Sequence, residues 1–362
     1  MAIQGGLAIG CRHAGPGRHG VAVPDQGGRP TLEDVAAYAG VSRSTASRAL
    51  NEETYVSPQA REKVLAAARD LGYSPNQAAR SLVTKRTGAV ALLLSEPESM
   101  VLDDPYYLIV MRAAFRELAN RGSQMLVMFV DNRDDIPRTM KFLDGGHVDG
   151  VLVFAPHIGD PLATALRLLR VPVVFGGSSV TNGKGLYTVD YDNKSGACLA
   201  VEHLLTQGRR RIVTVSGPQD QRSARDRLAG WQETLAAAGI DPTGLSEPAD
   251  FTQHGGDIAM QRLLDRVPDL DAVFAASDPM AAGAIRALRS AGRRVPDDVA
   301  VVGFDDNPRL APTLDPPLTS VHQDPGEQVG EMIRMLLQLQ TGQEPAVPRL
   351  VLPVSLTTRQ SA

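Results

Sequence analysis

Six side chains that can donate hydrogen bonds crowd into the segment GVSRSTASRAL at residues 40–50: Ser42, Arg43, Ser44, Thr45, Ser47 and Arg48. If this segment is helical, Ala46, Ala49 and Leu50 share one face, and both arginines lie on the opposite face. Arginines in that position can reach guanine edges or phosphate oxygens, and short hydroxyl side chains can bond either. A solvated helix surface has the same composition, so the neighbouring elements must decide between nucleic-acid binding and plain solvation.

A helix is predicted directly before this segment. Its apolar residues share one face at helical spacing: Leu32, Val35, Ala36 and Ala39. Thr31 is suited to cap the helix, and Asp34 three residues later is an acidic variant of the capping box. Gly40 is suited to end it, because glycine tolerates the left-handed conformation that commonly follows a helix.

A third predicted helix completes a helix-turn-helix unit. Ser42 is suited to cap the middle helix, and Ser57 followed by Pro58 begins a helix that closes at Gly72. In such units the second helix enters the major groove of DNA with its N-terminal half foremost. We therefore predict that this unit contacts DNA through Thr31, Ser42, Arg43, Ser44, Thr45, Ser47 and Arg48.

The next segment, GYSPNQAARSLVTKRTG at residues 72–88, is poor in apolar anchors and ends close to the basic pair Lys85 and Arg86. Pro75 disfavours a helical conformation at Ser74, and NQAARSLV can then form a short helix. On composition alone this segment is a linker between two modules.

Over residues 31–88, TLEDVAAYAGVSRSTASRALN and LGYSPNQAARSLVTKRTG resemble the headpiece and hinge of the LacI/GalR family of bacterial transcription regulators. The resemblance implies binding to double-stranded DNA at a palindromic operator. It also implies a hinge that folds into a helix only on the operator, where a leucine wedges into the minor groove. Leu82 matches that leucine, Ala79 lies on the same face one turn earlier, and Asn76 joins the predicted DNA contacts.

From Gly88 onward, short apolar strands such as AVALLLS alternate with helical periods such as PYYLIVMRAAFRELANRG. This alternation predicts an α/β fold whose parallel sheets are built from right-handed crossover units. Two such runs indicate two similar subdomains with a cleft between them. This body resembles the periplasmic-binding-protein-like sensor of the same family through VDGVLV, AVEHLL, SDPMAAGAIRAL and VVGFDD. The resemblance extends to about residue 359 and implies that the chain crosses between subdomains near Asp190, Gln323 and Pro353.

The predicted domains follow from these patterns and from the resemblance. They are a glycine-rich extension expected to be disordered, a headpiece, a hinge, and an effector-binding and dimerisation domain: residues 1–29, 30–76, 77–87 and 88–362. Within the last domain, the first subdomain comprises about 88–189 and 325–352, and the second about 190–323 and 353–362.

Loops such as SGPQD, ASD and GFDD follow predicted strands, and open α/β sheets bind ligands at the carboxyl ends of their strands. The resemblance matches Arg227 to the family's effector-binding arginine and Asp305 to its hydroxyl-binding acid. A fork-shaped donor and a two-oxygen acceptor can each bind neighbouring hydroxyls of a sugar. An ion pair at the edge of the cleft is the alternative for these two residues.

The remaining predicted effector contacts are Tyr106, Tyr107, Phe251, Ser277 and Gln323. The three aromatics occupy positions where relatives place walls against the ligand, and core packing is the alternative for them. Asp278 is a further candidate, although it can equally cap a helix beside Pro279.

The segment after VPVVF departs from many sugar-binding relatives, which carry an aspartate or arginine where this chain has Gly176, Gly177 and Ser178. This departure indicates room for a ligand larger than a monosaccharide. We expect a saccharide effector that releases the protein from DNA. A purine stacked on Tyr106 and Tyr107 is the alternative, and a transport-type solute-binding protein is disfavoured because it would need export.

Composition excludes several other classes. Hydrophobic residues make up 43% and charged residues 22% of the 362 residues, as in globular proteins, and no apolar run approaches the ~18 residues of a membrane span. Cys11 and Cys198 form no disulfide or metal-binding pattern, so we expect a cytoplasmic protein. GPGRHG, residues 15–20, matches a dinucleotide-binding pattern, but no strand precedes it. No catalytic or metal-ligand arrangement is present, and we expect neither an enzyme nor a cofactor.

The quaternary state is predicted from the symmetry of palindromic operators, which call for dimers. RLVLPVSLTTRQ is the last predicted strand, and no apolar heptad segment of the kind that joins dimers into tetramers follows it. We therefore predict a homodimer held together through residues 88–362.

Overall fold

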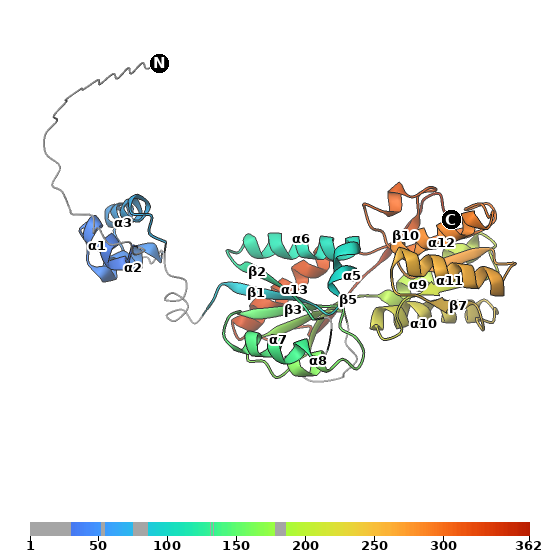
Figure 1. The fold of residues 1–362 in the computed structure, drawn as a ribbon, viewed down its shortest axis with the longest axis horizontal. Coiled ribbons are helices and arrows are strands. Elements are labelled where there is room, and N and C mark those ends of the chain that lie inside the picture. Colours follow the sequence, from blue (N-terminus) through green and yellow to red (C-terminus); the bar gives the residue numbers. More distant parts are fainter. Residues whose placement is uncertain (1–29, 52–54, 75–85, 131, 133, 178–185) are drawn as a thin grey trace, which may run out of the picture. The chain divides into compact units, whose positions relative to one another are not determined.

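The computed structural model describes residues 30–51, 55–74, 86–130, 132, 134–177 and 186–362 (Figure 1). The chain divides into two compact units, Met1–Thr84 and Lys85–Ala362, and each unit is described by itself. Several predictions lie outside the described residues: the disordered extension 1–29, the short hinge helix, the DNA contacts Asn76, Ala79 and Leu82, and Ser178 after β4.

The described residues of the first unit form three helices, α1 Leu32–Ala39, α2 Arg43–Leu50 and α3 Pro58–Asp70. The predicted capping box of α1 is present. The Asp34 N–H donates to the Thr31 hydroxyl at 3.3 Å, and the Thr31 N–H donates to the Asp34 carboxylate at 2.8 Å. Gly40 ends α1 in the left-handed conformation, with a φ of 65°. Ser42 caps α2 and Ser57 caps α3, which confirms both predictions.

Small apolar side chains form the core of the three-helix unit: Val35, Ala36, Ala46, Ala49, Val64, Ala67 and Ala68. Ala46 and Ala49 come from α2, so this helix packs against α1 and α3 by its predicted apolar face. The opposite face of α2 is left for another partner.

In the part of the second unit that the structure describes, the strands form two six-stranded sheets. The first sheet has the order β11-β5-β4-β3-β1-β2, and all its pairings are parallel. Its strands are β1 Ala89–Leu94, β2 Gln124–Phe129, β3 Gly150–Phe154, β4 Val173–Gly176, β5 Tyr187–Tyr191 and β11 Arg349–Leu352. Its helices are α5 Glu98–Asp103, α6 Pro105–Ala119, α7 Asp135–Asp144, α8 Pro161–Leu166 and α13 Pro325–Gln340. We call this sheet with its helices the first lobe.

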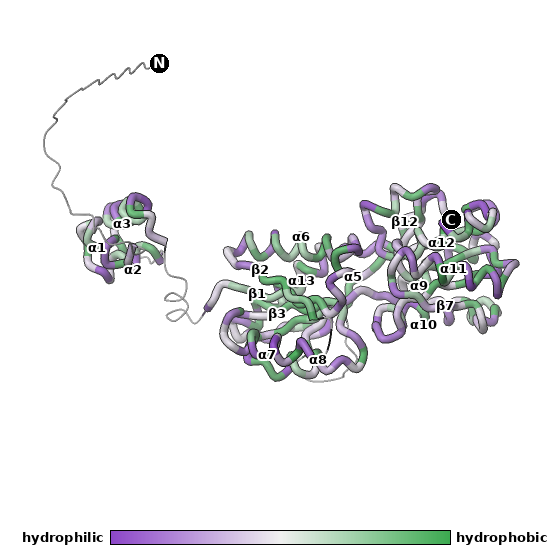
Figure 2. Tube along the Cα trace, viewed as in Figure 1, coloured by the Kyte–Doolittle hydropathy of each residue, from purple (hydrophilic) through white to green (hydrophobic). Residues whose placement is uncertain are grey.

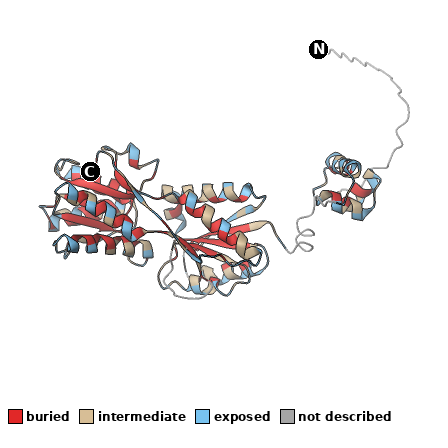
Figure 3. Cartoon of the chain, turned by 180° about the vertical axis from the view of Figure 1, so that it is seen from behind, coloured by how far each residue is buried: buried red, intermediate tan, exposed pale blue. Residues whose placement is uncertain are grey.

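The continuous apolar run of β1 has a direct structural reason. Leu92 and Leu94 pack into a core that includes residues of α6 and α13, whereas Ala91 and Leu93 pack into a core that includes residues of α7 and α8. Successive side chains of a strand point to opposite faces, so a strand covered on both faces must be apolar throughout. Figures 2 and 3 show such apolar, buried strands at the centre of both sheets.

The second sheet has the order β12-β10-β9-β8-β6-β7. Its strands are β6 Ile212–Ser216, β7 Ser246–Pro248, β8 Ala272–Ala275, β9 Ala300–Asp305, β10 Thr319–His322 and β12 Ser355–Thr357. Its helices are α9 Asn193–Thr206, α10 Arg222–Ala237, α11 Gln253–Arg266 and α12 Asp278–Ser290, and the 3-10 helix η1 spans Ala311–Thr313. Helix α9 packs on α10, and α11 packs on α12. We call this sheet with its helices the second lobe.

The chain passes between the two sheets three times, after β5, after β10 and after β11. The predicted last strand is therefore two strands in different sheets, with Pro353 between them. The predicted parallel pairing is confirmed for most strands, and the second sheet is mixed only because β12 pairs antiparallel with β10 at its edge. A proline lacks the N–H that a strand interior needs, which fits a change of sheet at this point.

Candidate functional site

A cavity of about 770 Å³, which includes space open to solvent, is lined by both lobes. It lies at the carboxyl ends of the parallel strands, where Gly176 and Gly177 close β4, Asp305 closes β9 and Gln323 follows β10. All seven predicted effector contacts line it: Tyr106, Tyr107, Arg227, Phe251, Ser277, Asp305 and Gln323. Helices, loops and strand ends that are far apart in the sequence thus bring these side chains to one place.

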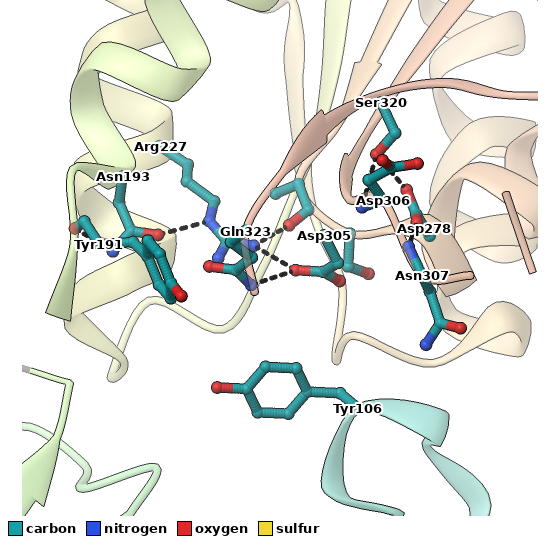
Figure 4. A network of polar contacts seen from close by, with 12 residues as sticks. Tyr106, Tyr191, Asn193, Arg227, Asp278, Asp305, Asp306, Asn307, Ser320 and Gln323 are labelled. Atoms are coloured by element: carbon teal, nitrogen blue, oxygen red, sulfur yellow. Dashed lines mark hydrogen bonds and ion pairs between the residues drawn. The ribbon is translucent and has the colours of Figure 1, made fainter. Parts of the chain in front are cut away.

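The polar centre of the cavity is a connected group around Arg227 (Figure 4). Its Nε donates to Asn193 Oδ1 at 2.9 Å, and its Nη1 donates to the Ala276 carbonyl at 2.6 Å. Nη1 also lies 3.5 Å from Asp305 Oδ1, which accepts a hydrogen bond from Gln323 Nε2 at 2.7 Å. The two residues are therefore a buried ion pair and line the cavity at once.

The guanidinium of Arg227 is held from several sides. Its Cζ lies 3.6 Å from the ring centroid of Phe304, and only 6% of its side chain is exposed. Burial lowers the pKa of Arg227, and Asp305 opposes that change. A planar donor fixed in this way loses little conformational freedom when a ligand hydroxyl binds to it.

The environment of Asp305 disfavours the charged form of its carboxylate. Burial raises the pKa of Asp305 to about 7, although the nearby Arg227 lowers it. The backbone of Asp305 has a φ of 108° and that of Asp306 a φ of 49°, both in a region that non-glycine residues rarely adopt. Such strain persists only where neighbouring groups hold the loop in place.

Asp278 supplies that support. It is fully buried at the start of α12, where Ser277 caps the helix through the Met280 N–H. The Asp278 carboxylate accepts from the Ser320 hydroxyl at 2.6 Å and from the Asn307 N–H at 2.6 Å (Figure 4). The alternative of Asp278 as a helix cap is therefore wrong, and among the described residues it is not part of the cavity lining. It braces the strained loop from behind.

The aromatic residues lie on both lobes. Tyr106, from α6, lies opposite Arg227 and Asp305 (Figure 4), and its hydroxyl donates to Gln328 Oε1 at 3.4 Å. Its ring meets that of Tyr107 edge to face, with centroids 5.4 Å apart. Tyr107 is buried in the first-lobe core as well as lining the cavity, so both interpretations hold for it. Phe251, only partly buried, lines the cavity from the second lobe.

The cavity also contains polar residues that sequence reasoning missed: Asp104, Asp190, Asn193, Gln221 and Gln328. Asp104 caps α6, and burial raises its pKa to about 6. Asp190 and Asn193 belong to the polar run DYDN at the carboxyl end of β5, a signal equivalent to the one used for GFDD. Gln328 lies inside α13, where nothing in the local pattern distinguishes it from a core-facing polar residue.

The polar face of α2 is open to a partner within its unit. Ser42, Arg43, Ser44 and Arg48 are exposed, whereas Thr45 and Ser47 are half-buried, and Thr31 is exposed at the cap of α1. Arg43 Nε lies 2.6 Å from the Glu33 carboxylate, and Arg48 Nε donates to the Ser44 carbonyl. Both pairs are solvated, so a phosphate can replace them at little cost.

The described residues contain neither a metal-binding cluster nor a helix that could span a membrane. No group of three or more His, Cys, Asp and Glu side chains there could hold a metal ion. Every helix there is too short or too polar to cross a bilayer.

Two family models match the chain. Residues 31–76 match the model described as bacterial regulatory proteins, lacI family, and residues 201–362 match the periplasmic binding protein-like domain. The HTH-type transcriptional regulator CelR of Thermobifida fusca is 45% identical over 336 residues, which cover 92% of this chain and 98% of the relative. The ribose operon repressor of Escherichia coli strain K12 is 33% identical over 336 residues, covering 92% and 99%.

Solved structures give the same result. The transcriptional regulator CelR-cellobiose complex aligns with a TM-score of 0.73 and 43% identity, covering 92% of this chain and all of that chain. The lac repressor dimer bound to operator and the anti-inducer ONPF aligns with a TM-score of 0.82 and 32% identity, covering 92% and 99%. Both are matched across nearly their whole length, including the DNA-binding end.

Proposed function

Because this chain belongs to the lacI family of bacterial regulatory proteins, we propose that it is a transcriptional repressor that releases its operator when a saccharide fills the cavity between the lobes. It acts on double-stranded DNA and therefore in the cytoplasm. The arrangement that carries the proposal is the Arg227–Asp305–Gln323 group facing Tyr106 across one cavity.

The DNA-binding part of the proposal rests on α2. Its exposed face offers Arg43 and Arg48 to base edges or phosphates, and the short hydroxyls of Ser42 and Ser44 lie beside them. We assign the headpiece to residues 30–76, the hinge to 77–87 and the effector-binding and dimerisation domain to 88–362. Support comes from the lacI family model, which ends at residue 76. By the same resemblance, Asn76, Ala79 and Leu82 contact the operator.

The chemistry of the cavity favours a polyol. Carboxylates accept hydrogen bonds through two oxygens, amides both donate and accept, and the Arg227 guanidinium donates. Sugar hydroxyls are donors and acceptors at once, so a lining of this kind can satisfy several of them together. Aromatic rings such as Tyr106 can cover the apolar face of a sugar ring.

The glycines at the end of β4 favour a saccharide larger than one ring. Both Gly176 and Gly177 line the cavity without a side chain. A Cβ at Gly176 would lie 2.7 Å from Phe154, so this position stays small for packing reasons as well. The described relative CelR forms a complex with cellobiose, a disaccharide. We therefore propose a disaccharide or short oligosaccharide as the effector.

A melting-temperature screen tests the effector class. Purified protein is heated with cellobiose, other saccharides and purine bases or nucleosides. A ligand at 100 times its dissociation constant stabilises the folded protein by ~2.7 kcal/mol, which is easily visible as a shift. A shift confined to saccharides supports the proposal. A shift confined to purines would replace the saccharide with a base stacked on Tyr106 and Tyr107.

A further inference from the structure

Three loops from the two lobes meet beside the effector cavity. Glu96 follows β1 and His157 follows β3 in the first lobe, while Asp220 and Gln221 precede α10 in the second lobe. His157 Nδ1 lies 2.8 Å from Asp220 Oδ2, and His157 Nε2 lies 3.3 Å from Glu96 Oε1. The imidazole therefore bridges a carboxylate of its own lobe and a carboxylate of the other.

Main-chain and amide contacts reinforce this bridge. The Ile158 N–H donates to the Asp220 carbonyl at 2.6 Å, and His157 pairs with Gln221 as an isolated antiparallel β-bridge. The Gln221 side-chain amide donates to Glu96 Oε1. Three contacts between the lobes are thus concentrated within a few residues: the His157–Asp220 ion pair, the β-bridge with its main-chain hydrogen bond, and the Gln221–Glu96 hydrogen bond.

This contact reaches the effector cavity through Gln221. Gln221 is buried and lines the cavity, and one of its amide hydrogens is committed to Glu96. Glu96 is itself only 3% exposed, so it has little access to water that could replace these partners. If the lobes separated, the Glu96 carboxylate would lose a hydrogen-bond donor and the Gln221 side-chain amide would lose its acceptor.

We propose that Glu96, His157, Asp220 and Gln221 form a latch that holds the two lobes closed over the effector, with the His157–Asp220 ion pair making effector affinity fall at alkaline pH. This inference rests on the proposed function, because it concerns regulation of the same cavity. His157 and Asp220 are positioning residues, since neither lines the cavity among the described residues.

The direction of the pH effect follows from the charges at the latch. The hydrogen bond to Glu96 raises the pKa of His157 to about 9, burial opposes the rise, and Asp220 adds to it. Glu96 stays beside His157 when the lobes separate, but Asp220 does not. The closed arrangement therefore holds the imidazolium more tightly. This stabilisation of the closed arrangement is complete below the pKa that His157 has when the lobes are apart. It is lost as the pH rises through the pKa of about 9 that His157 has when they are together.

Other ionisable groups near the latch do not reverse this sign. Asp160, on the loop of His157, is bonded to Ser95 in the first lobe, and Arg222 is paired with Asp226 within α10. Asp104 lies on the cavity side of Glu96, and it stays with Glu96 in the same lobe. None of these three side chains hydrogen-bonds to the other lobe in the described structure. None of them therefore holds the lobes together once His157 loses its proton.

Calorimetric titration with cellobiose at about pH 7 and about pH 9.5 tests the latch in the full-length protein. We expect the wild-type affinity for cellobiose to fall about fivefold between the two pH values. His157→Gln and Asp220→Asn should already bind cellobiose about fivefold more weakly than wild type at about pH 7, and their affinity should show no fivefold fall between about pH 7 and about pH 9.5. The pKa of Asp305 is also about 7, but Asp305 is present in wild type and in every variant. Its contribution to the pH dependence therefore cancels when the affinity of each variant is divided by the wild-type affinity at the same pH. His203→Gln is the matched control, because His203 lies on α9 and its ring contacts Gln207 at the C-terminal end of that helix, within the second lobe.

A ligand-free measurement separates the latch from the choice of sugar. Hydrogen exchange of the Ile158 amide, corrected for its intrinsic rate, reports the bond to Asp220 directly. The Ser95 amide, which donates to Phe154 within the first lobe, serves as the internal reference. We expect protection at Ile158 to decrease between the two pH values in wild type and to be low already in His157→Gln.

The outcomes of the two measurements are distinguishable. If Ile158 loses protection as expected and no saccharide binds, the latch stands and the proposed effector is wrong. If cellobiose binds but His157→Gln keeps wild-type protection and the wild-type pH profile, the latch is overturned and the proposed function stands.

Discussion

At the scale of single residues, the cavity depends on charges that are buried and mutually compensated. Arg227 and Asp305 have only 6% and 13% of their side chains exposed, and each is within 3.5 Å of the other. Breaking such a pair leaves an uncompensated polar group in a low-dielectric site, which costs more than a surface contact of the same kind.

Arg227→Ala is expected to weaken effector binding by about a hundredfold or more, because it removes a buried donor and leaves Asp305 without its cation. Operator affinity should change little, since Arg227 lies inside the effector domain. Calorimetry with the saccharide and fluorescence anisotropy on operator DNA measure the two effects. Arg225→Ala is the control on the same helix, because the Arg225 side chain is exposed, donates to the Gln219 carbonyl, and is not among the described residues that line the cavity. Normal effector binding by Arg227→Ala would remove this residue from the site.

Arg48→Ala should do the reverse. It removes one exposed cation from α2, so operator binding should weaken by about tenfold or more while effector binding survives. Arg69→Ala changes the net charge equally but on α3, and it controls for nonspecific electrostatics. Equal losses of operator affinity in both variants would mean that Arg48 contributes only to the overall positive potential of the headpiece.

At the scale of elements, much of the architecture could be predicted because its causes are local. Thr31, Gly40 and Ser57 mark helix ends through bonds to residues within a few positions, and the structure has these ends where the pattern predicts them. The alternation of strands and helices likewise fixes the α/β class. The antiparallel β12 could not be predicted, since its pairing with β10 joins residues more than 30 positions apart.

The site shows the same division between local and distant causes. Arg227 and Asp305 carry recognisable motifs around them, so their positions could be inferred from the chain. Asp278 braces its loop through Ser320, and His157 meets Asp220, over separations of 42 and 63 residues. No periodicity or spacing in the sequence encodes such contacts, and only the folded sheets reveal them.

The hinge is the element that must convert sensing into release. A helix of about eight residues is unstable alone in water because its nucleation is costly, so residues 77–84 should become helical only on the operator. Leu82→Ala should therefore lose specific operator affinity while binding to scrambled DNA persists, since it removes a wedge between base pairs. Val83→Ala is the neighbouring control. Equal loss on both DNAs would mean that Leu82 only packs the fold.

At the scale of the whole molecule, the account requires two copies of the chain. The described relative with the TM-score of 0.82 is a dimer on its operator. We expect light scattering at micromolar concentration to give twice the chain mass of 38.6 kDa. A monomer or a stable tetramer would not fit a single palindromic site with half-sites about one helical turn apart.

The central claim is that a saccharide in the cavity controls DNA binding. The most direct measurement is an anisotropy titration of a palindromic DNA site, selected from a random pool by the protein itself, with and without saturating cellobiose. We expect cellobiose to weaken binding by at least about tenfold, equivalent to a coupling of ~1–3 kcal/mol between the two sites. Superimposable titrations, despite calorimetric proof that cellobiose is bound, would contradict the account.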